Sequence, residues 1–436
     1  MKANVPRRED LESLSIARVG EPTIESPLKL RGNLFTDDSD RVVVHADSDT
    51  IGASLKEGEM PPMFEAAGPR KKIFFDPASL TCGIVTCGGL CPGLNDVVRS
   101  ITLTLLLQYG VKKVLGFRYG YGGLSANADH PPMELTPDVV DGIQHKGGTI
   151  LGTSRGMQEP AEMVETLLEY DVRILFVVGG DGTFKGAHRI AAEIKKRGLT
   201  IAVVGVPKTI DNDIYGSESS FGFGTAVDKA REAIASAHEE ARAAFNGIGL
   251  VKVMGRDSGF IAACSSLANS DVNFCLIPES PFRLEGDDGL LRRIETRLAR
   301  KHHAVIVAAE GAGQGLLKET HQKDAAGNVI YADIGLFLKG AISEYLSQKN
   351  ISFTIKYIDP SYTIRSCPAN ARDSIFCLLL AEMAVHAGMA GKTDMFVGYW
   401  NQHFTNMPLS FAVNKRKKLD TNGPLWQTLL AITSEK

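Results

Sequence analysis

A buried strand that ends in a glycine turn is the feature that most constrains how this chain can fold. The run 174–178 is entirely apolar and is followed by the segment Gly179-Gly180-Asp181-Gly182-Thr183. Such a run predicts a strand of a parallel sheet, and the glycines after it let the backbone approach a phosphate closely. The helix predicted over 184–197 would direct free N–H groups and the positive end of its dipole at the same turn. An ordinary strand-to-helix turn is equally compatible with this motif taken alone.

The same alternation of strands and helices continues along most of the chain and predicts an α/β fold. Strands are expected at 41–45, 82–86, 111–117, 174–178, 201–206, 249–254, 272–277 and 304–309. Helices are expected at 94–108, 159–169, 184–197, 226–244, 289–301 and 333–347. We therefore expect two doubly wound, Rossmann-like domains with mainly parallel sheets, which flank a cleft. The predicted organisation is an N-terminal extension (1–70), a first domain (71–220), a second domain (221–390) and a C-terminal arm (391–436).

Composition narrows the class of protein and its partners. Of the 436 residues, 44% are apolar and the formal net charge is −3, which gives no general attraction to nucleic acid or to an anionic membrane. No apolar run approaches the roughly 18 residues of a membrane span, and residues 1–10 lack the apolar core of a signal peptide, so a cytoplasmic protein is expected. Seven cysteines without the spacing of metal ligands predict reduced thiols. The basic run 415–418 indicates a solvated face or an edge of the substrate site.

Three further loops follow predicted strands and carry polar or glycine-rich sequence. The first, 86–95, is a second glycine turn that would face the same crevice at the strand ends. The second, 207–213, holds Thr209, Asp211 and Asp213 at alternating positions, where an extended chain directs side chains to one face. A carboxylate there could take a proton from an alcohol, and a neighbouring acid would raise its pKa. An ordinary Asp/Asn turn is the alternative interpretation.

The third loop, 253–259, offers Arg256 with a glycine close by on each side. The planar guanidinium of arginine suits a phosphate or a phosphosugar better than the point charge of lysine does. Two more segments, with Glu310 before a glycine and Tyr362 three residues before Arg365, are individually unremarkable. They become informative because they extend the same ordered series of motifs.

The ordered set of these motifs resembles the 6-phosphofructokinase family, which includes ATP-dependent and pyrophosphate-dependent enzymes. The resemblance covers residues 80–400 and depends on the segments GGLCPGLN, GGTILGTSRG, GGDGT, PKTIDND, MGRDSG, IPE, AEG and DPSYTIRS. GGDGT alone also occurs in NAD kinases and lipid kinases, whereas the ordered series is highly specific. The Pro-Lys-Thr segment, GGLCPG and the long N-terminal extension resemble the atypical ATP-dependent group of the family. The resemblance implies that the first domain binds ATP with Mg²⁺ and that the second binds fructose 6-phosphate.

The resemblance also implies roles for individual residues. Asp211 matches the general base that accepts the proton of the 1-hydroxyl of the sugar, and Arg155 matches the arginine that steadies the transferred phosphoryl group. Asp181 matches the aspartate that is associated with magnesium. The donor and its metal are expected to contact Gly88, Arg155, Gly156, Gly179, Gly180, Asp181, Gly182, Thr183 and Lys208. The sugar phosphate is expected to contact Thr209, Ile210, Asp211, Asp213, Met254, Gly255, Arg256, Glu310, Tyr362, Thr363, Ile364 and Arg365.

Two residues bear on the identity of the phosphoryl donor. Lys208 resembles the pyrophosphate-dependent enzymes, whereas Gly182 stands where those enzymes have an aspartate. An aspartate there would occupy the place of the α-phosphate of ATP and repel it, while a lysine at 208 repels neither donor. We therefore predict ATP as the donor. A pyrophosphate-dependent enzyme and a non-catalytic regulatory subunit of the same fold are the alternatives, and the family implies a homo-oligomer, either a tetramer or a dimer.

Overall fold

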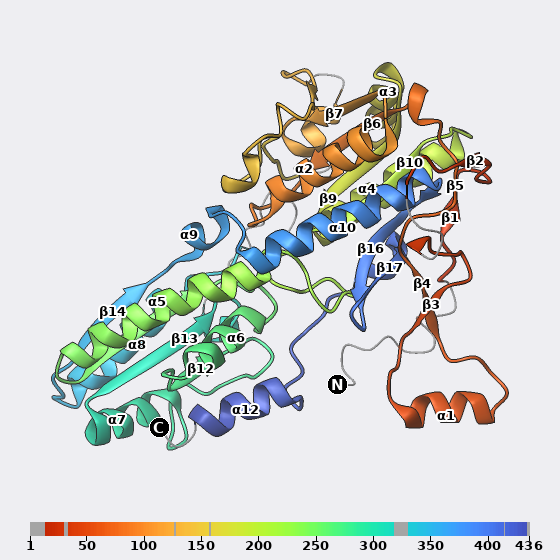
Figure 1. Cartoon of the computed structure of the whole chain (residues 1–436). Coiled ribbons are helices and arrows are strands. Elements are labelled where there is room, and N and C mark those ends of the chain that lie inside the picture. The colour runs from red at the N-terminus through yellow and green to blue at the C-terminus, as the bar shows by residue number, and fades with distance from the viewer. Residues whose placement is uncertain are drawn as a thin grey trace.

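Two lobes, each built on its own β-sheet, make up most of the described chain (Figure 1). The computed structural model describes residues 14–29, 34–125, 128–156, 158–317, 330–413 and 415–433. In the view of Figure 1, the lobe that contains β6, β9 and β10 lies at the upper right, and the lobe that contains β12, β13 and β14 lies at the lower left.

The first sheet has nine strands in the order β3-β4-β17-β16-β10-β9-β6-β7-β8. Their bounds are β3 Arg41–Val43, β4 Met63–Ala66, β17 His403–Pro408, β16 Met395–Trp400, β10 Ala202–Pro207, β9 Val172–Gly179, β6 Thr81–Thr86, β7 Lys113–Phe117 and β8 Met133–Glu134. The strands from β16 to β7 pair in parallel, and antiparallel strands flank them on both sides. In this register, Val204 of β10 pairs with Phe176 of β9 on one side and with Met395 of β16 on the other.

Helices cover both faces of this parallel core, because side chains alternate along each strand. Ile174 and Phe176 of β9 pack into one cluster with α2 and α10, whereas Leu175 and Val177 pack into another with α3 and α4. Burial on both faces explains why the run 174–178 is continuously apolar. The helices are α2 Leu94–Leu103, continued by a π-helical turn η4 Thr104–Tyr109, and α3 Pro160–Glu169, α4 Asp181–Lys196 and α10 Ala371–Met389.

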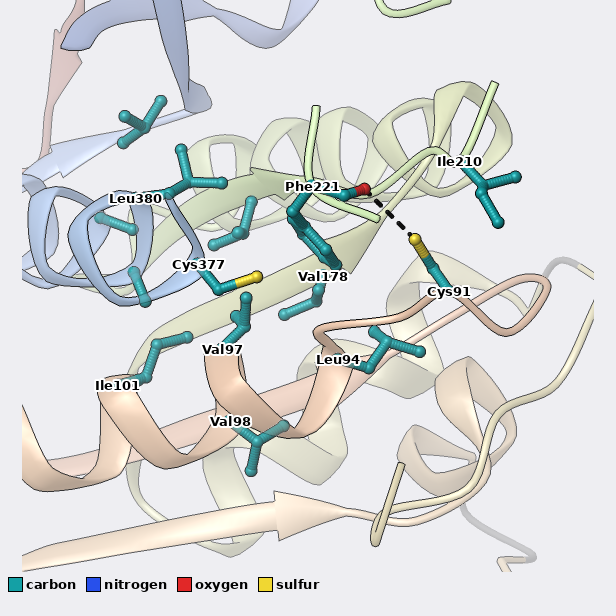
Figure 2. Close-up of a cluster of buried hydrophobic side chains, with 14 of the residues drawn as sticks. Cys91, Leu94, Val97, Val98, Ile101, Val178, Ile210, Phe221, Cys377 and Leu380 are labelled. Carbon is teal, nitrogen blue, oxygen red and sulfur yellow. Dashed lines mark hydrogen bonds between the residues drawn. The ribbon is translucent and has the colours of Figure 1, made fainter. Parts of the chain in front are cut away.

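The core beneath the first glycine turn fixes that turn against α10. Figure 2 shows the buried side chains of α2 facing those of α10, and it shows Cys91 reaching the chain at Phe221, where its Sγ lies 3.3 Å from the carbonyl oxygen. An added Cβ at Gly93 would lie only 2.5 Å from the Sγ of Cys377. A larger residue would therefore push the turn away from the helix.

The second sheet is entirely parallel and is also covered on both faces. Its order is β12-β13-β11-β14, with bounds β12 Phe274–Leu276, β13 His303–Ala309, β11 Gly247–Val253 and β14 Thr354–Ile358. Ile248 and Ile306 pack with α7 and α8, whereas Val251 and Val307 pack with α5 and α6. These helices are α5 Phe223–Ala243, α6 Phe260–Asn269, α7 Leu290–Lys301 and α8 Ile334–Gln348. The two sheets together confirm the expected α/β fold with two doubly wound units.

The ranges predicted as an N-terminal extension and a C-terminal arm both contribute strands to the first sheet. Strands β3 and β4 come from the range 1–70, and β16 and β17 come from the range 391–436, yet all four pair within the first sheet. A separate helix, α12 Pro424–Thr433, packs against α6 of the second lobe. The residues between β17 and α12 therefore cross from one lobe to the other. The four domain ranges remain a prediction.

Smaller elements complete the described structure. They are β1 Ala17–Arg18, paired with β15 Lys392–Thr393, and β2 Ile24–Glu25, paired with β5 Lys72–Ile73, together with α1 Ser48–Lys56, η3 Pro77–Ser79, η5 Gly120–Leu124, η6 Ile143–His145, η7 Gln314–Leu316, α9 Ser361–Ser366 and α11 Leu409–Ala412. Residues 1–13, which include the whole segment 1–10 considered for a signal peptide, lie outside the described residues. Within the described ranges, none of the helices is both long enough and apolar enough to cross a membrane.

Candidate active site

Loops from both lobes enclose a cleft of about 890 Å³ at the carboxyl ends of their strands. In open α/β sheets this is the place where ligands bind. Most of the predicted site residues line it, namely Gly88, Arg155, Gly156, Gly180, Asp181, Gly182, Thr183, Lys208, Thr209, Ile210, Asp211, Asp213, Met254, Arg256, Glu310, Tyr362 and Arg365. The fold thus brings together motifs that lie far apart in the sequence.

Four of the predicted site residues do not line this cleft, and these are Gly179, Gly255, Thr363 and Ile364. An added Cβ at Gly179 would lie 2.3 Å from Oγ1 of Thr183. Gly255 has φ +142°, and a Cβ there would lie 2.3 Å from the carbonyl oxygen of Ser258. The side chain of Ile364 is completely buried in the core, while that of the preceding residue is exposed. The two glycines permit tight turns at the strand ends, and Ile364 anchors α9.

The first glycine turn is bonded to the loop that carries Arg155. The N–H of Gly88 donates to the carbonyl oxygen of Ser154 (3.0 Å), and Oγ1 of Thr153 donates to the carbonyl oxygen of Gly88 (2.6 Å). These bonds hold two backbone segments side by side in one wall of the cleft. They place the guanidinium of Arg155 within the same cavity as the glycine turn.

The second glycine turn is the amino terminus of a helix. Helix α4 begins at Asp181, three residues earlier than predicted, so that Gly182 lies in its first turn. Backbone N–H groups of a first helical turn have no partner within the helix and bind anions well. An added Cβ at Gly182 would meet no described atom within 4 Å. The hydroxyl of Tyr121 donates to the carbonyl oxygen of Thr183 (2.6 Å) and braces this turn.

The carboxylate of Asp181 has one oxygen that is suited to a metal ion. Its Oδ2 lies 3.2 Å from Nζ of Lys185 and 3.8 Å from Nη2 of Arg416. Its Oδ1 is buried and has no hydrogen-bond partner among the described residues. Carboxylate oxygens are typical Mg²⁺ ligands, and Mg²⁺ usually completes its shell with phosphates and water. The described residues contain no cluster of three or more His, Cys, Asp or Glu side chains that could hold a metal ion.

The predicted acid pair of the 207–213 loop lies deep in the cleft. Oγ1 of Thr209 donates to Oδ1 of Asp213 (2.6 Å) and accepts from the N–H of Asp211 (3.2 Å). Oδ1 of Asp211 is buried and receives no hydrogen bond from any described group. Burial, Asp213 and Glu310 raise the pKa of Asp211 well above its ordinary value. A carboxylate in this environment binds a proton readily, which is the property that a general base requires.

A turn, and not the extended chain that the spacing indicated, brings these side chains together. The chain turns at residues 210–211, shortly after the end of β10 at Pro207, and Oγ of Ser258 holds the turn by donating to the carbonyl oxygen of Asp211 (3.0 Å). Before the turn, Nζ of Lys208 donates to the carbonyl oxygen of Gly89 (2.8 Å). Burial lowers the pKa of Lys208. This lysine therefore links the 207–213 loop to the first glycine turn.

Loops of the second lobe form the opposite wall. Arg256 has φ +43°, and its N–H donates to Oε1 of Glu310 (3.0 Å). Burial raises the pKa of Glu310. On α9, the guanidinium carbon of Arg365 lies 4.6 Å from the ring centroid of Tyr362, which is a cation–π geometry. The cleft therefore presents fixed cations and a carboxylate to a polar ligand on this side.

Other lining residues were not predicted individually, and these are Cys87, Gly89, Leu90, Tyr121, Ser154, Lys185, Arg189, Lys252, Ile330, Tyr331, Asp359, Ser361 and Arg416. Lys185 and Arg189 follow Asp181 at one and two helical turns, and this spacing could have indicated them. The position of Arg416 had no local signal beyond the basic run 415–418. That run was predicted as a solvated face or as an edge of the substrate site. Arg416 lines the cleft, which agrees with the second of these predictions.

The arrangement defines a class of enzyme. A helix amino terminus, a glycine turn and several cations line one cleft and could hold a phosphorylated ligand, and a buried carboxylate of raised pKa lines the same cleft. Phosphoryl transfer requires alignment, neutralised charge and a proton acceptor for the attacking hydroxyl. The fold and the site together are those of a phosphotransferase.

Comparison with known proteins identifies the family. The family model described as "Phosphofructokinase" matches residues 81–388, and the chain belongs to the phosphofructokinase family. An "ATP-dependent 6-phosphofructokinase" of Borreliella burgdorferi is 53% identical over 86% of this chain and 85% of its own. A protein of the same name from Amycolatopsis methanolica is 47% identical, over 98% of this chain and 95% of the length of that protein. The crystal structure of a pyrophosphate-dependent phosphofructokinase of Marinobacter aquaeolei has a TM-score of 0.67 at 20% identity, covers 81% of this chain and 91% of its own, and supports the fold alone.

Proposed function

We propose that the chain is an ATP-dependent 6-phosphofructokinase of glycolysis. It transfers a phosphoryl group from ATP to the 1-hydroxyl of D-fructose 6-phosphate and yields fructose 1,6-bisphosphate and ADP. The relatives that match most of the chain carry the name of this activity. The observation that carries the proposal is that one cleft holds both the open first turn of α4 and a buried carboxylate oxygen of Asp211 that has no hydrogen-bond partner among the described residues.

The donor occupies the side formed by the first lobe. Its phosphates lie against the backbone of Gly88 and of the 180–183 turn, with Lys208 and Arg155 as cations. Oδ1 of Asp181 would hold the Mg²⁺ that enters with ATP, and the ion would supply positive charge that offsets the charge of the phosphates. Fructose 6-phosphate occupies the opposite side, where its hydroxyls meet Met254, Arg256 and Glu310 and its phosphate meets Tyr362 and Arg365.

The reaction is a direct displacement at the terminal phosphorus of ATP. The oxygen of the sugar hydroxyl forms a bond to phosphorus, the bond to the bridging oxygen breaks, and ADP leaves with the electron pair. Asp211 receives the proton of the hydroxyl, and its raised pKa suits it to hold that proton until product release. Arg155 neutralises charge that develops on the transferred group. A covalent phosphoenzyme is not needed.

ATP is favoured over pyrophosphate by the room at Gly182. Nothing among the described atoms stands within 4 Å of the place where a side chain at this position would begin. A longer donor can therefore extend beyond its reacting phosphates. The decisive experiment is an assay of fructose 1,6-bisphosphate formation with ATP and with pyrophosphate in turn. We expect activity with ATP; activity with pyrophosphate alone would reverse the donor, and inactivity with both would favour a non-catalytic subunit.

Location and assembly belong to the same proposal. A cytoplasmic enzyme that forms a homo-oligomer, either a dimer or a tetramer, agrees with glycolytic function and with the frequency of symmetric oligomers. Neither nucleic acid nor a membrane is expected as a partner, because the net charge of −3 gives no general attraction to either. Sedimentation of the purified chain would measure the number of subunits.

A further inference from the structure

The basic run 415–418 has four side chains in four different environments. Nζ of Lys415 lies 5.3 Å from the ring centroid of Tyr215, and the side chain of Lys417 is buried. Lys418 is exposed. Arg416 alone among the four lines the cleft. A run that looks uniform in sequence therefore directs one guanidinium into the active site.

The backbone at Arg416 is held against the 207–213 loop. Arg416 forms an isolated antiparallel β-bridge with Ile214, and the N–H of Lys417 donates to the carbonyl oxygen of Asp213 (2.9 Å). Nζ of Lys417 donates to Oδ1 of Asn212 (3.0 Å) and to the carbonyl oxygen of Ser217 (2.7 Å). These contacts are buried, and they fix the place from which the side chain of Arg416 extends.

The segment is also anchored on both lobes. It leaves the first sheet after β17 and reaches α12 on the second lobe, as the blue chain between them shows in Figure 1. Beyond the basic run, the N–H of Leu419 donates to Oε1 of Glu279 (2.9 Å), a residue of the second lobe. Arg416 therefore lies where the chain passes the boundary between the two lobes.

The guanidinium of Arg416 lies between acids from the two sides of the cleft. Its Nη1 forms an ion pair with Oδ2 of Asp257, the residue after Arg256, and Oδ1 of Asp257 accepts from the hydroxyl of Tyr331. Its Nη2 lies 3.8 Å from Oδ2 of Asp181, which is beyond hydrogen-bond distance. Asp257, on the side proposed for the sugar, thus holds one edge of the guanidinium. The other edge faces Asp181, on the side proposed for the donor.

We propose that Arg416 is a further catalytic residue, whose Nη2 edge donates to the phosphoryl group during transfer while Asp257 holds its other edge. This role rests on the proposed function. The bond changes are those of the displacement described above, with Asp211 as proton acceptor, and Arg416 adds no covalent step. Arginine suits this task because its planar group offers five N–H donors, so that two acceptors are served at once. The donation strengthens as charge moves onto the transferred oxygens.

The test compares Arg416→Met and Arg416→Lys with the matched control Lys418→Met in the full chain. Steady-state kinetics with ATP and fructose 6-phosphate should give a kcat about 10²- to 10³-fold lower for Arg416→Met, the loss expected for one donor to a transition state. Both KM values should change less than about threefold, because the contact tightens only during transfer. Arg416→Lys should recover part of the loss, and Lys418→Met, which removes the same charge, should retain wild-type kcat.

Chemical rescue separates this role from a structural one. Guanidinium ion at non-denaturing concentration should restore part of the activity of Arg416→Ala, while sodium chloride at equal ionic strength should not. A kcat for Arg416→Met within about threefold of wild type would overturn the proposal, as would equal losses in Arg416→Met and Lys418→Met or the absence of guanidinium rescue. A wild-type chain without activity on these substrates would instead overturn the proposed function itself.

Discussion

The environment of Asp211 agrees with the role of general base that we propose for this residue. Its carboxylate is buried beside Asp213 and Glu310, and one oxygen has no hydrogen-bond donor among the described groups. We expect Asp211→Asn to lower kcat by roughly 10²- to 10⁴-fold with a modest change in either KM, because the amide cannot accept the proton. Steady-state kinetics would measure both constants. A variant that turned over at nearly the wild-type rate would remove Asp211 from its role as base.

The pH dependence of catalysis should depend on Asp213 as well. A base with a raised pKa loses activity as the pH falls through that raised value, and Asp213 contributes to the raising. Asp213→Asn removes a negative charge but keeps an oxygen that can accept from Thr209. We expect the acidic limb of the profile of kcat/KM to move to lower pH by roughly one unit. Glu193→Gln, near the C-terminal end of α4, should leave the limb in place, and an upward shift in Asp213→Asn would contradict the assignment.

We propose that Gly182 sets the choice between ATP and pyrophosphate as phosphoryl donor. An aspartate at this position would place a carboxylate in the open space at the start of α4, beside Asp181. We expect Gly182→Asp to lower kcat/KM for ATP by at least about tenfold, because the added charge repels the α-phosphate. Gly182→Ala, which adds a methyl group without charge, is the matched control. Equal use of ATP by wild type and Gly182→Asp would refute the steric and electrostatic argument.

At the scale of elements, α9 carries the two residues assigned to the 6-phosphate. Tyr362 and Arg365 lie one turn apart on this helix, and the loop before it is tied to β11 because Nζ of Lys252 lies 2.7 Å from Oδ2 of Asp359. We expect Arg365→Ala to raise KM for fructose 6-phosphate by roughly ten- to hundredfold with a small change in kcat, through the loss of charge-assisted hydrogen bonds. Steady-state kinetics with varied fructose 6-phosphate would measure this KM. The KM of Arg365→Lys should lie between those of the wild type and of Arg365→Ala. An unchanged KM would move the 6-phosphate elsewhere.

Elements with a strong local pattern could be predicted from the sequence, and those that depend on distant partners could not. The run 174–178 was correctly predicted as a strand because both of its faces are buried. Helix α9 was not predicted: it is short, and the burial of Ile364 depends on packing against distant parts of the chain. The start of α4 was placed three residues late because glycines at 180 and 182 weaken the helical pattern.

At the scale of the whole molecule, the first sheet depends on residues that looked peripheral. Phe64 of β4 is completely buried, and its ring centroid lies 5.6 Å from that of Trp400 on β16. We expect Phe64→Ala to reduce the free energy of unfolding by about 3–5 kcal/mol. Leu55→Ala, at an exposed leucine of α1 from the same range, should change it by less than about 0.5 kcal/mol. Denaturant unfolding would measure the free energy of unfolding of both variants. If Phe64→Ala changed it as little as Leu55→Ala, β4 would not be needed for the stability of the first sheet.

The composition of the site could be predicted better than its assembly. Motifs at strand ends identified most of the lining, because parallel strands end at one edge of a sheet. Arg416 could not be placed in this way, since its position depends on a chain crossing between lobes that leaves no periodic pattern. The same holds for β16 and β17, which had no signal linking them to strands more than a hundred residues away.

The order of strands in the first sheet has a consequence for synthesis. Strand β16 is the parallel neighbour of β10, yet the ribosome makes it only after all four strands of the second sheet. Until then, β10 has an unpaired apolar edge, and such an edge can pair with another chain. A nascent chain can thus contain every strand of its second sheet while the first sheet still lacks β16. Premature termination within this interval should release a product that needs a chaperone to remain dispersed.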